Sequence, residues 1–232
     1  MKFTGERFQL GGSSNRTKAD AIVKYLFASF FTRGKVVLDI ASGSGFGTFF
    51  LAQESAKAIG VDISQEAVGY AKDSFCRSNL VYEYGDAANY VYPEKYFDVI
   101  VSFQTIEHLN EPNIFLESLG KALKDDGMIV LGTPNKKIVS PFTKEPIGEF
   151  HKFEFYKKDL EKMFEDKFQA KWYGQRCTFK PLAWWLLRRS IRFLEIILNY
   201  NFGFYGVKES YQIKPLKFWH EPKDFIIILT KK

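Results

Sequence analysis

Residues 35–47 read KVVLDIASGSGFG, which is a short apolar run, one acidic residue and a turn rich in glycine. The run at 35–40 is nearly continuous in apolar character, as is typical of a buried strand in a parallel sheet. The turn opens a helical pattern at 47–55, so it presents backbone amides at a helix N-terminus, and its glycines let a ligand approach closely. The segment predicts a strand–turn–helix unit that binds a small ligand, a feature that nucleotide and dinucleotide sites share.

The same alternation continues on both sides of this unit. Short β-rich runs and helical patterns follow one another, with strands expected at 58–61, 80–84, 97–102 and 128–132 and helices at 17–31, 64–77 and 112–123. Pro112 stands where a first helical turn tolerates proline, and Asp125-Asp126-Gly127 breaks the helix before the next strand. This order predicts an α/β fold with a Rossmann-like, doubly wound sheet of about seven strands, mostly parallel. Two final strands, at 168–173 and 224–230, are expected to form an antiparallel C-terminal hairpin.

Acidic residues end three consecutive predicted strands, at Asp39, Asp62 and Asp86. Ligands of open α/β sheets bind at the carboxyl ends of the strands, so these acids are expected to converge on one cleft. Asp39 would repel a pyrophosphate but would suit the ammonium group of a bound amino acid, and the glycines miss the G-x-G-x-x-G spacing of a dinucleotide site. Asp62 is placed to accept ribose hydroxyls, and Asp86 with Ala87 to contact an adenine ring.

These residues resemble the class I S-adenosylmethionine-dependent methyltransferases, and in particular their small-molecule, type 11-like group. The resemblance covers about 35–135 and includes the Glu-His after the fourth strand. It implies S-adenosyl-L-methionine as cofactor, with its methionine part near Asp39 and the glycines, and it departs from the family at Ala41, where glycine is usual. The cofactor-binding residues that it implies are Asp39, Ala41, Gly43, Gly45, Asp62, Ile63, Asp86, Ala87, Phe103 and Gln104.

The length of 232 residues fits a single methyltransferase domain. We expect an N-terminal lid and helix at 1–34, the cofactor-binding core at 35–135, and a helical insertion at 178–222 before the last strand. The net charge of +6 either favours an acidic partner or keeps the protein soluble. No apolar signal segment opens the chain and the cysteines have no metal-site spacing, so a cytoplasmic location is expected.

Histidines are the natural general bases for a hydroxyl acceptor, whose proton must leave as the methyl group arrives. The candidate catalytic residues are His151, in a His-x-x-x-Phe stretch that resembles the acceptor side of small-molecule methyltransferases, and His108, just past the fourth strand. His108 equally suits a helix-start residue that orients Glu107, and His220 suits a structural role. The acids and histidines show no metal-ligand spacing along the chain, so no metal site is expected.

Two segments bear on the acceptor. Residues 4–8, TGERF, resemble a motif of methyltransferases linked to surface-polysaccharide synthesis, which implies O-methylation of a sugar, glycan or lipid-linked intermediate. Residues 181–200 combine an apolar face with Trp and Arg, which suits an acceptor lid, a homodimer contact or a peripheral membrane contact. DNA is a poor fit because the turn after the fourth strand has no Pro-Pro-aromatic motif, whereas RNA is harder to exclude. The alternatives are a methyltransferase for a quinone or aromatic lipid precursor, and a cofactor-binding partner subunit without catalysis.

Overall fold

A computed structural model describes residues 15–148, 150–176, 178–179, 213–217 and 220–232 of the chain. Its centre is an eight-stranded sheet in the order β3-β2-β1-β4-β5-β10-β6-β8, and a two-stranded sheet joins β7 to β9. The strands are β1 (Val36–Ile40), β2 (Lys57–Asp62), β3 (Leu80–Tyr84), β4 (Phe97–Phe103), β5 (Leu123–Pro134), β6 (Phe168–Gln175), β7 (Thr178–Phe179), β8 (Ile213–Pro215), β9 (His220–Glu221) and β10 (Asp224–Lys231). The mixed, Rossmann-like α/β class predicted from the sequence is confirmed.

The first five strands form the parallel half of the sheet. β1 pairs with β2 on one side, with Leu38 opposite Ile59, and with β4 on the other, with Leu38 opposite Ile100. The order reverses at β1, because β2 and β3 lie to one side of it and β4 and β5 to the other. Such a reversal leaves a crevice at the carboxyl ends of the strands, where ligands bind in this class of fold.

The second half of the sheet is antiparallel. β10 lies between β5 and β6 and pairs with both, so that Ile227 is opposite Leu131 on one side and Trp172 on the other. The expected hairpin therefore exists, because β6 and β10 are neighbours and antiparallel. The three-residue β8 pairs with the outer side of β6 and makes the sheet one strand wider than expected. It lies in the stretch at 178–222 that was predicted as a helical insertion.

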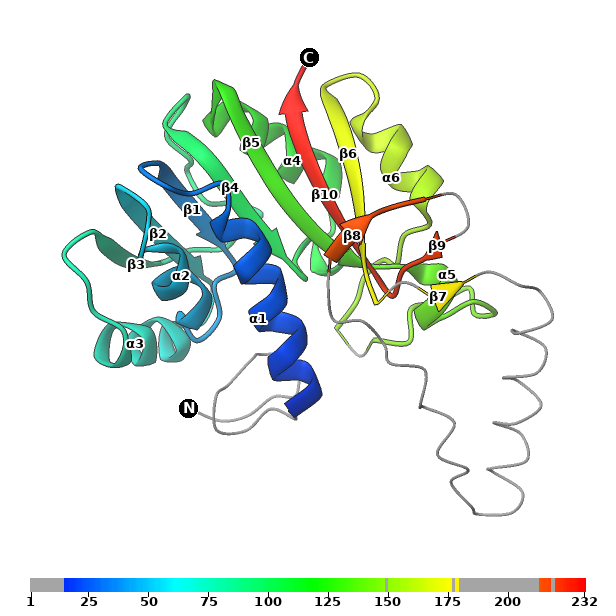
Figure 1. The fold of residues 1–232 in the computed structure, drawn as a ribbon, viewed down its shortest axis with the longest axis horizontal. Helices are drawn as coiled ribbons and strands as arrows, with labels where there is room; N and C mark the ends of the chain where they lie inside the picture. The colour runs from blue at the N-terminus through cyan, green and yellow to red at the C-terminus, as the bar shows by residue number, and fades with distance from the viewer. Residues whose placement is uncertain (1–14, 149, 177, 180–212, 218–219) are drawn as a thin grey trace.

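Helices cover both faces of the sheet (Figure 1). Apolar side chains of α4 (Pro112–Ala122) and α6 (Lys157–Phe164) pack with one set of strand residues, including Leu38 and Ile100. α1 (Asn15–Ser29) and α2 (Phe46–Leu51) pack on the opposite face with the alternate residues, such as Val37 and Val101. The remaining helices are α3 (Gln65–Ser74), which packs on β3, the 3₁₀ turn η1 (Ile106–His108) and α5 (Lys136–Val139).

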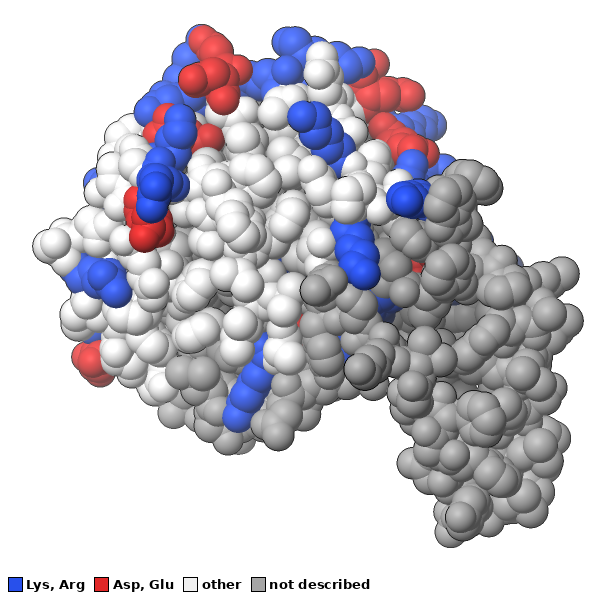
Figure 2. Space-filling view, in the orientation of Figure 1, with Lys and Arg blue, Asp and Glu red and all other residues white. Residues whose placement is uncertain are grey.

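The main local difference from the sequence prediction is in β5. Asp125-Asp126-Gly127 was predicted to break the preceding helix, but α4 already ends at Ala122 and these residues belong to β5. They interrupt its pairing, since the register between β4 and β5 shifts between Phe97 and Val99. The expected lid motif at 4–8 and most of the insertion at 178–222 lie outside the described residues. Among the helices that the structure describes, none is long and apolar enough to cross a lipid bilayer. On the face shown in Figure 2, Lys and Arg side chains lie singly or beside acidic ones, around a broad uncharged area.

Candidate active site

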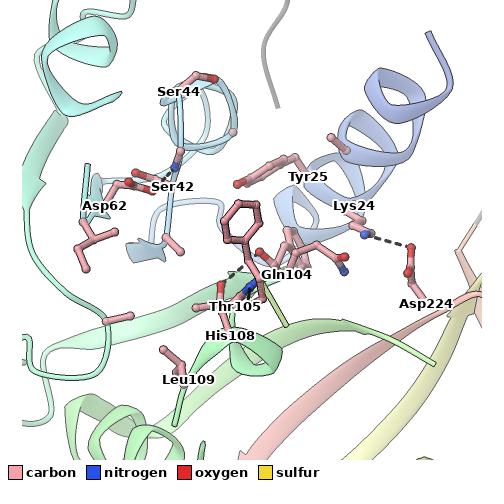
Figure 3. A pocket seen from close by; sticks show the side chains of 18 of the residues that line it. Lys24, Tyr25, Ser42, Ser44, Asp62, Gln104, Thr105, His108, Leu109 and Asp224 are labelled. Carbon is pink, nitrogen blue, oxygen red and sulfur yellow. Dashed lines mark hydrogen bonds and ion pairs between the residues drawn. The ribbon is translucent and has the colours of Figure 1, made fainter. Parts of the chain in front are cut away.

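A cleft of about 720 Å³ opens at the carboxyl ends of β1, β2, β3 and β4. Asp62 and Ser42 lie on one side of it and the Lys24–Asp224 pair on the other, with Gln104 and Thr105 between them (Figure 3). The residues that the sequence singled out and that line this cleft are Ala41, Gly43, Asp62, Ile63, Asp86, Ala87, Phe103, Gln104, His108 and His151. The fold therefore brings both candidate histidines and most of the expected cofactor contacts to one cavity.

The glycine-rich turn is held by Asp62. Gly43 has a φ of 57° and donates its amide hydrogen to Asp62 Oδ2 at 2.8 Å, and Ser64 N donates to Oδ1 at 2.9 Å. The Asp62 side chain is buried but reaches the cleft wall. Each carboxylate oxygen has two lone pairs, so Asp62 can fix the turn and still accept a ligand hydroxyl.

Gly45 does not line the cleft, and a glycine is needed at this position for packing. Its φ is 82°, and a Cβ atom there would lie 2.5 Å from Ala71 Cβ and 2.9 Å from the Tyr82 ring. The Gly45 carbonyl also accepts a hydrogen bond from Tyr82 Oη at 2.8 Å. Only glycine therefore lets the start of α2 pack directly against α3 and β3.

Asp39 lies beneath the cleft wall instead of on its surface. It is 1% exposed, and its carboxylate accepts hydrogen bonds from Thr48 Oγ1 at 2.7 Å and from Tyr25 Oη at 3.2 Å. Burial raises the pKa of Asp39 to about 7, although the two hydroxyl hydrogen bonds oppose this effect. Asp39 can therefore act on a ligand only through the cleft residues that cover it, of which Tyr25 is one. Tyr25 comes from α1, and nothing in the local sequence pattern marked it.

The expected adenine end is formed by the loop after β3. Asp86 is half-buried and accepts hydrogen bonds from Ala88 N at 3.0 Å and from Asn89 Nδ2 at 2.8 Å. Ala87 is buried beside it, and Ile63 is 55% exposed at the rim. This end thus combines a carboxylate with apolar surface, which suits a flat, partly polar ring.

Gln104 occupies the middle of the cleft in a strained conformation. Its φ is 53°, outside the range that most residues adopt, and its amide donates to the Gly132 carbonyl at 2.8 Å. Its side-chain Nε2 is buried and has no hydrogen-bond partner among the described residues. A buried donor without a partner carries a cost that a bound ligand's acceptor atom would remove.

His108 and His151 meet at the far end of the cleft. Their ring centroids are 4.9 Å apart with an interplanar angle of 77°. His108 Nδ1 lies 3.0 Å from the Phe150 carbonyl oxygen, and His151 Nδ1 lies 3.2 Å from Glu154 Oε1. Each ring is therefore oriented by an acceptor, and Phe150 also lines the cleft beside them.

Glu107 lies directly behind this pair. It is fully buried and accepts a hydrogen bond from Thr133 Oγ1 at 3.0 Å. Burial raises the pKa of Glu107 to about 8. Its backbone carbonyl accepts from Lys152 N at 2.8 Å and from Phe153 N at 3.0 Å, so η1 anchors the segment that carries His151.

The wall opposite Asp62 is built from buried charges that sequence reasoning missed. Lys24 of α1 pairs with Asp224 of β10 at 3.2 Å, with side chains 7% and 5% exposed. Asp20 of α1 pairs with Arg176 at 2.6 Å. Lys24, Asp20 and Asp224 all line the cleft. The signal that could have found them is the presence of Asp and Lys on the apolar side of an amphipathic helix, at 20 and 24.

Comparisons with known proteins give a family for the central part of the chain. Residues 38–131 match the family model described as Methyltransferase domain. A protein of Mycolicibacterium smegmatis described as a probable S-adenosylmethionine-dependent methyltransferase is 29% identical over 132 residues, which cover 57% of this chain and 51% of the relative. A ubiquinone biosynthesis O-methyltransferase of Bradyrhizobium diazoefficiens is 32% identical over 104 residues, which cover 44% of this chain and 41% of the relative. The chain thus spans about half the length of the curated relatives it matches.

Solved structures show the same architecture. A methyltransferase of Thermotoga maritima, described as a possible histamine N-methyltransferase, superposes with a TM-score of 0.64 at 16% identity, covering 93% of this chain and 90% of the other. An S-adenosylmethionine-dependent methyltransferase of Archaeoglobus fulgidus gives 0.61 at 20% identity, covering 94% and 95%. At these identities the likeness concerns the fold alone. The family model matches residues 38–131 as a methyltransferase domain, and the glycine turn and the strand-end acids agree with an S-adenosylmethionine-dependent enzyme of class I.

Proposed function

We propose that the protein transfers the methyl group of S-adenosylmethionine to a hydroxyl oxygen of a small molecule that has an apolar part. The observation that carries this proposal is the pair of oriented histidines, His108 and His151, at the end of the cofactor cleft. A hydroxyl needs help to lose its proton, and imidazole is the side chain suited to that task near neutral pH.

The cleft fits the cofactor that this domain family uses. Asp62 and Asp86 supply carboxylate acceptors at two strand ends, where ribose hydroxyls and an adenine amino group would bind. Gln104 Nε2 supplies a buried donor that lacks a partner within the described part of the chain, which suits the carboxylate of the methionine part. S-adenosylmethionine supplies an activated methyl group on a sulfonium sulfur, so the protein's task is to place the acceptor in line with it and to exclude water.

The chain's own residues divide that task. Tyr25 and Phe103 pack edge to face, with ring centroids 5.3 Å apart, and close the cleft from the side of α1. Phe150 and Leu109 flank the histidines and shield the acceptor oxygen from water. Glu154 orients His151 through its Nδ1 atom, which leaves Nε2 to accept a hydrogen bond from the acceptor hydroxyl.

The segment that carries His151 supports the proposal that the acceptor has an apolar part. Phe142, Ile147, Phe150 and Phe153 are each more than a third exposed there, at 67%, 63%, 49% and 41%. Phe150 lines the cleft, and exposed apolar side chains on the segment that enters it suit an aromatic or prenylated ligand. One relative acts in ubiquinone biosynthesis, which agrees with a quinol or aromatic lipid precursor as the acceptor.

A sugar or glycan intermediate is the second acceptor class. It is supported by the opposite wall, where the charged side chains of Asp20, Lys24 and Asp224 line the cleft. Such a wall offers many hydrogen bonds to a ligand rich in hydroxyl groups. The two classes differ in which wall the acceptor must touch.

Calorimetric titration with S-adenosylmethionine and S-adenosylhomocysteine tests the first step. Micromolar binding is expected, followed by transfer of a labelled methyl group to a quinol with a free phenolic hydroxyl, with sugar nucleotides and glycolipids as the comparison set. Binding of the cofactor without transfer to any hydroxyl compound would favour a partner subunit without catalysis. Absence of binding to a folded sample would overturn the proposal.

A further inference from the structure

Glu107, His108 and His151 gather at the acceptor end of the cleft, although His151 lies far from the other two along the chain. Each offers one ligand atom, and these atoms all lie within 4.8 Å of one another. Glu107 and His108 belong to η1, and His151 is brought to them by backbone hydrogen bonds between Glu107 O and the amides of Lys152 and Phe153. The grouping is therefore fixed by the fold and not by a local motif.

The hydrogen bonds of the two rings select the tautomer that a metal ion needs. His108 Nδ1 lies against the Phe150 carbonyl oxygen, which can only accept, so Nδ1 carries the proton. His151 Nδ1 lies against the Glu154 carboxylate, which has the same consequence. In both neutral rings the lone pair is then on Nε2, and histidines that bind metals are commonly held by a carbonyl or carboxylate at the other nitrogen.

The buried carboxylate is the second, independent observation. Glu107 is 0% exposed and Oε2 accepts a hydrogen bond from Thr133, but Oε1 has no hydrogen-bond partner among the described residues. A buried carboxylate oxygen without a partner is costly, and a cation in contact with it would remove that cost.

We propose that Glu107, His108 and His151 bind a divalent transition-metal ion, of the Zn²⁺ or Co²⁺ class, at the acceptor end of the cleft. Two imidazole nitrogens and one carboxylate oxygen favour such an ion over Mg²⁺ or Ca²⁺, which prefer oxygen ligands. Three protein ligands leave a coordination position open, as in catalytic sites and unlike closed structural ones. Both histidines line the cleft, so a ligand in the cleft could reach an ion that they bind.

The role of this ion rests on the proposed function. The ion holds the acceptor hydroxyl and lowers its pKa, so the hydroxyl gives its proton to solvent as it binds, before the cleft residues exclude water. The oxygen then forms its bond to the methyl carbon as the carbon–sulfur bond breaks, and the bonding pair returns to sulfur as a neutral thioether. In this scheme the histidines are ligands of the ion and do not themselves take the proton.

Metal binding is tested on the full chain by titration with Co²⁺ after removal of metals with a chelator. The visible absorption of Co²⁺ bound by nitrogen and oxygen ligands is the readout, and Zn²⁺ is then added as a competitor. The variants are Glu107→Gln, which keeps the acceptor for Thr133, His108→Ala and His151→Ala. Asp73→Ala is the control, because this exposed acid of α3 is described and does not belong to the cluster. Binding of S-adenosylhomocysteine reports that each variant is folded with an intact cofactor site.

The wild-type protein and the control variant are expected to form the Co²⁺ complex, and Zn²⁺ to displace it. Each cluster variant should weaken Co²⁺ binding by more than about a hundredfold, and Glu154→Gln, which acts through His151, by about ten- to a hundredfold. The proposal is overturned if the wild type binds S-adenosylhomocysteine but shows no Co²⁺ spectrum, or if the cluster variants bind Co²⁺ as the wild type does. A Co²⁺ complex without cofactor binding or methyl transfer would instead contradict the proposed function.

Discussion

The Tyr25 hydroxyl lies 3.2 Å from both carboxylate oxygens of Asp39 and so joins α1 to the end of β1. Tyr25 also packs over Gly47, where a Cβ atom would lie 1.9 Å from the tyrosine ring. Asp39, at the start of the glycine turn, is therefore covered by α1, a helix that precedes the parallel core in the chain. This contact has a consequence for stability.

The stability of the protein is expected to depend on the ionisation of Asp39. The pKa of Asp39 is about 7 in the folded state, above the unfolded value near 4. Between these two pH values the folded state therefore binds more protons than the unfolded state. The stability that this group contributes is full below about pH 4 and is lost as the pH rises through about 7. Asp39→Asn should therefore gain stability relative to the wild type between pH 4 and 8, on the order of 2–4 kcal/mol. Urea unfolding at several pH values measures this difference.

Tyr25→Phe serves as the companion variant. Removal of one of the hydrogen bonds that lower the Asp39 pKa should move the pH-dependent loss of stability to higher pH. A pH profile for Asp39→Asn that runs parallel to the wild type would contradict this account of the buried pair.

Cofactor binding is expected to depend strongly on Asp62. Asp62→Ala removes both the expected ribose contact and the hydrogen bonds that hold Gly43 and Ser64. Hydrogen bonds to a charged group contribute about 1.5–3 kcal/mol, so S-adenosylhomocysteine should bind at least about tenfold more weakly. Calorimetry gives the affinity, and Asp73→Ala, an exposed acid of α3, should leave it unchanged. Equal affinities in the two variants would remove Asp62 from the site.

Gly45 is expected to tolerate no side chain. Gly45→Ala would place a Cβ atom 2.5 Å from Ala71 Cβ at a φ of 82°, so we expect a loss of at least about 2 kcal/mol in the free energy of unfolding. Gly69→Ala is the control, since it lies in α3 with open space around it and should be stabilising by up to about 1 kcal/mol. Thermal unfolding of both variants measures this difference. Equal decreases in the two transition temperatures would contradict the packing argument.

His151 is expected to matter for turnover more than for cofactor binding. His151→Ala should lower kcat by roughly a hundredfold or more, whether the ring acts as a base or holds an ion. S-adenosylhomocysteine affinity should change little, because the ring lies at the acceptor end of the cleft. A variant with normal kcat and a raised KM for the acceptor would make His151 a binding residue only.

Much of the fold follows from patterns that the sequence carries locally. The apolar runs of β1, β2 and β4 predicted their strands closely, because each of these strands is buried along most of its length and reads as nearly continuous apolar sequence. β3 was predicted with the same bounds, although only Tyr82 of it is buried. β7, β8 and β9 were not foreseen, since strands of two or three residues are too short to show a periodicity. The break at Asp125-Asp126-Gly127 was predicted as the end of a helix, but α4 ends at Ala122 and these residues lie within β5, where the register shifts.

The site was predictable where it depends on one loop and unpredictable where it depends on contacts between elements. Ala41, Gly43 and Asp62 line the cleft, as expected for residues at strand ends. The burial of Asp39 could not be foreseen, because Tyr25 of α1 causes it. Likewise, ligand spacing along the chain reveals only residues that are close in sequence, whereas His151 reaches Glu107 only through the fold.

The position of β10 between β5 and β6 has a consequence for the order in which the protein can be made. During synthesis β1 to β5 leave the ribosome first and can assemble, but β5 and β6 cannot become part of one sheet until residues 224–231 have been translated. Until then β5 presents an edge of unpaired amides and carbonyls, the kind of edge on which chains aggregate. The nascent chain therefore passes through an intermediate in which the parallel half of the sheet has formed and the antiparallel half has not. We expect this intermediate to be the state that chaperones protect.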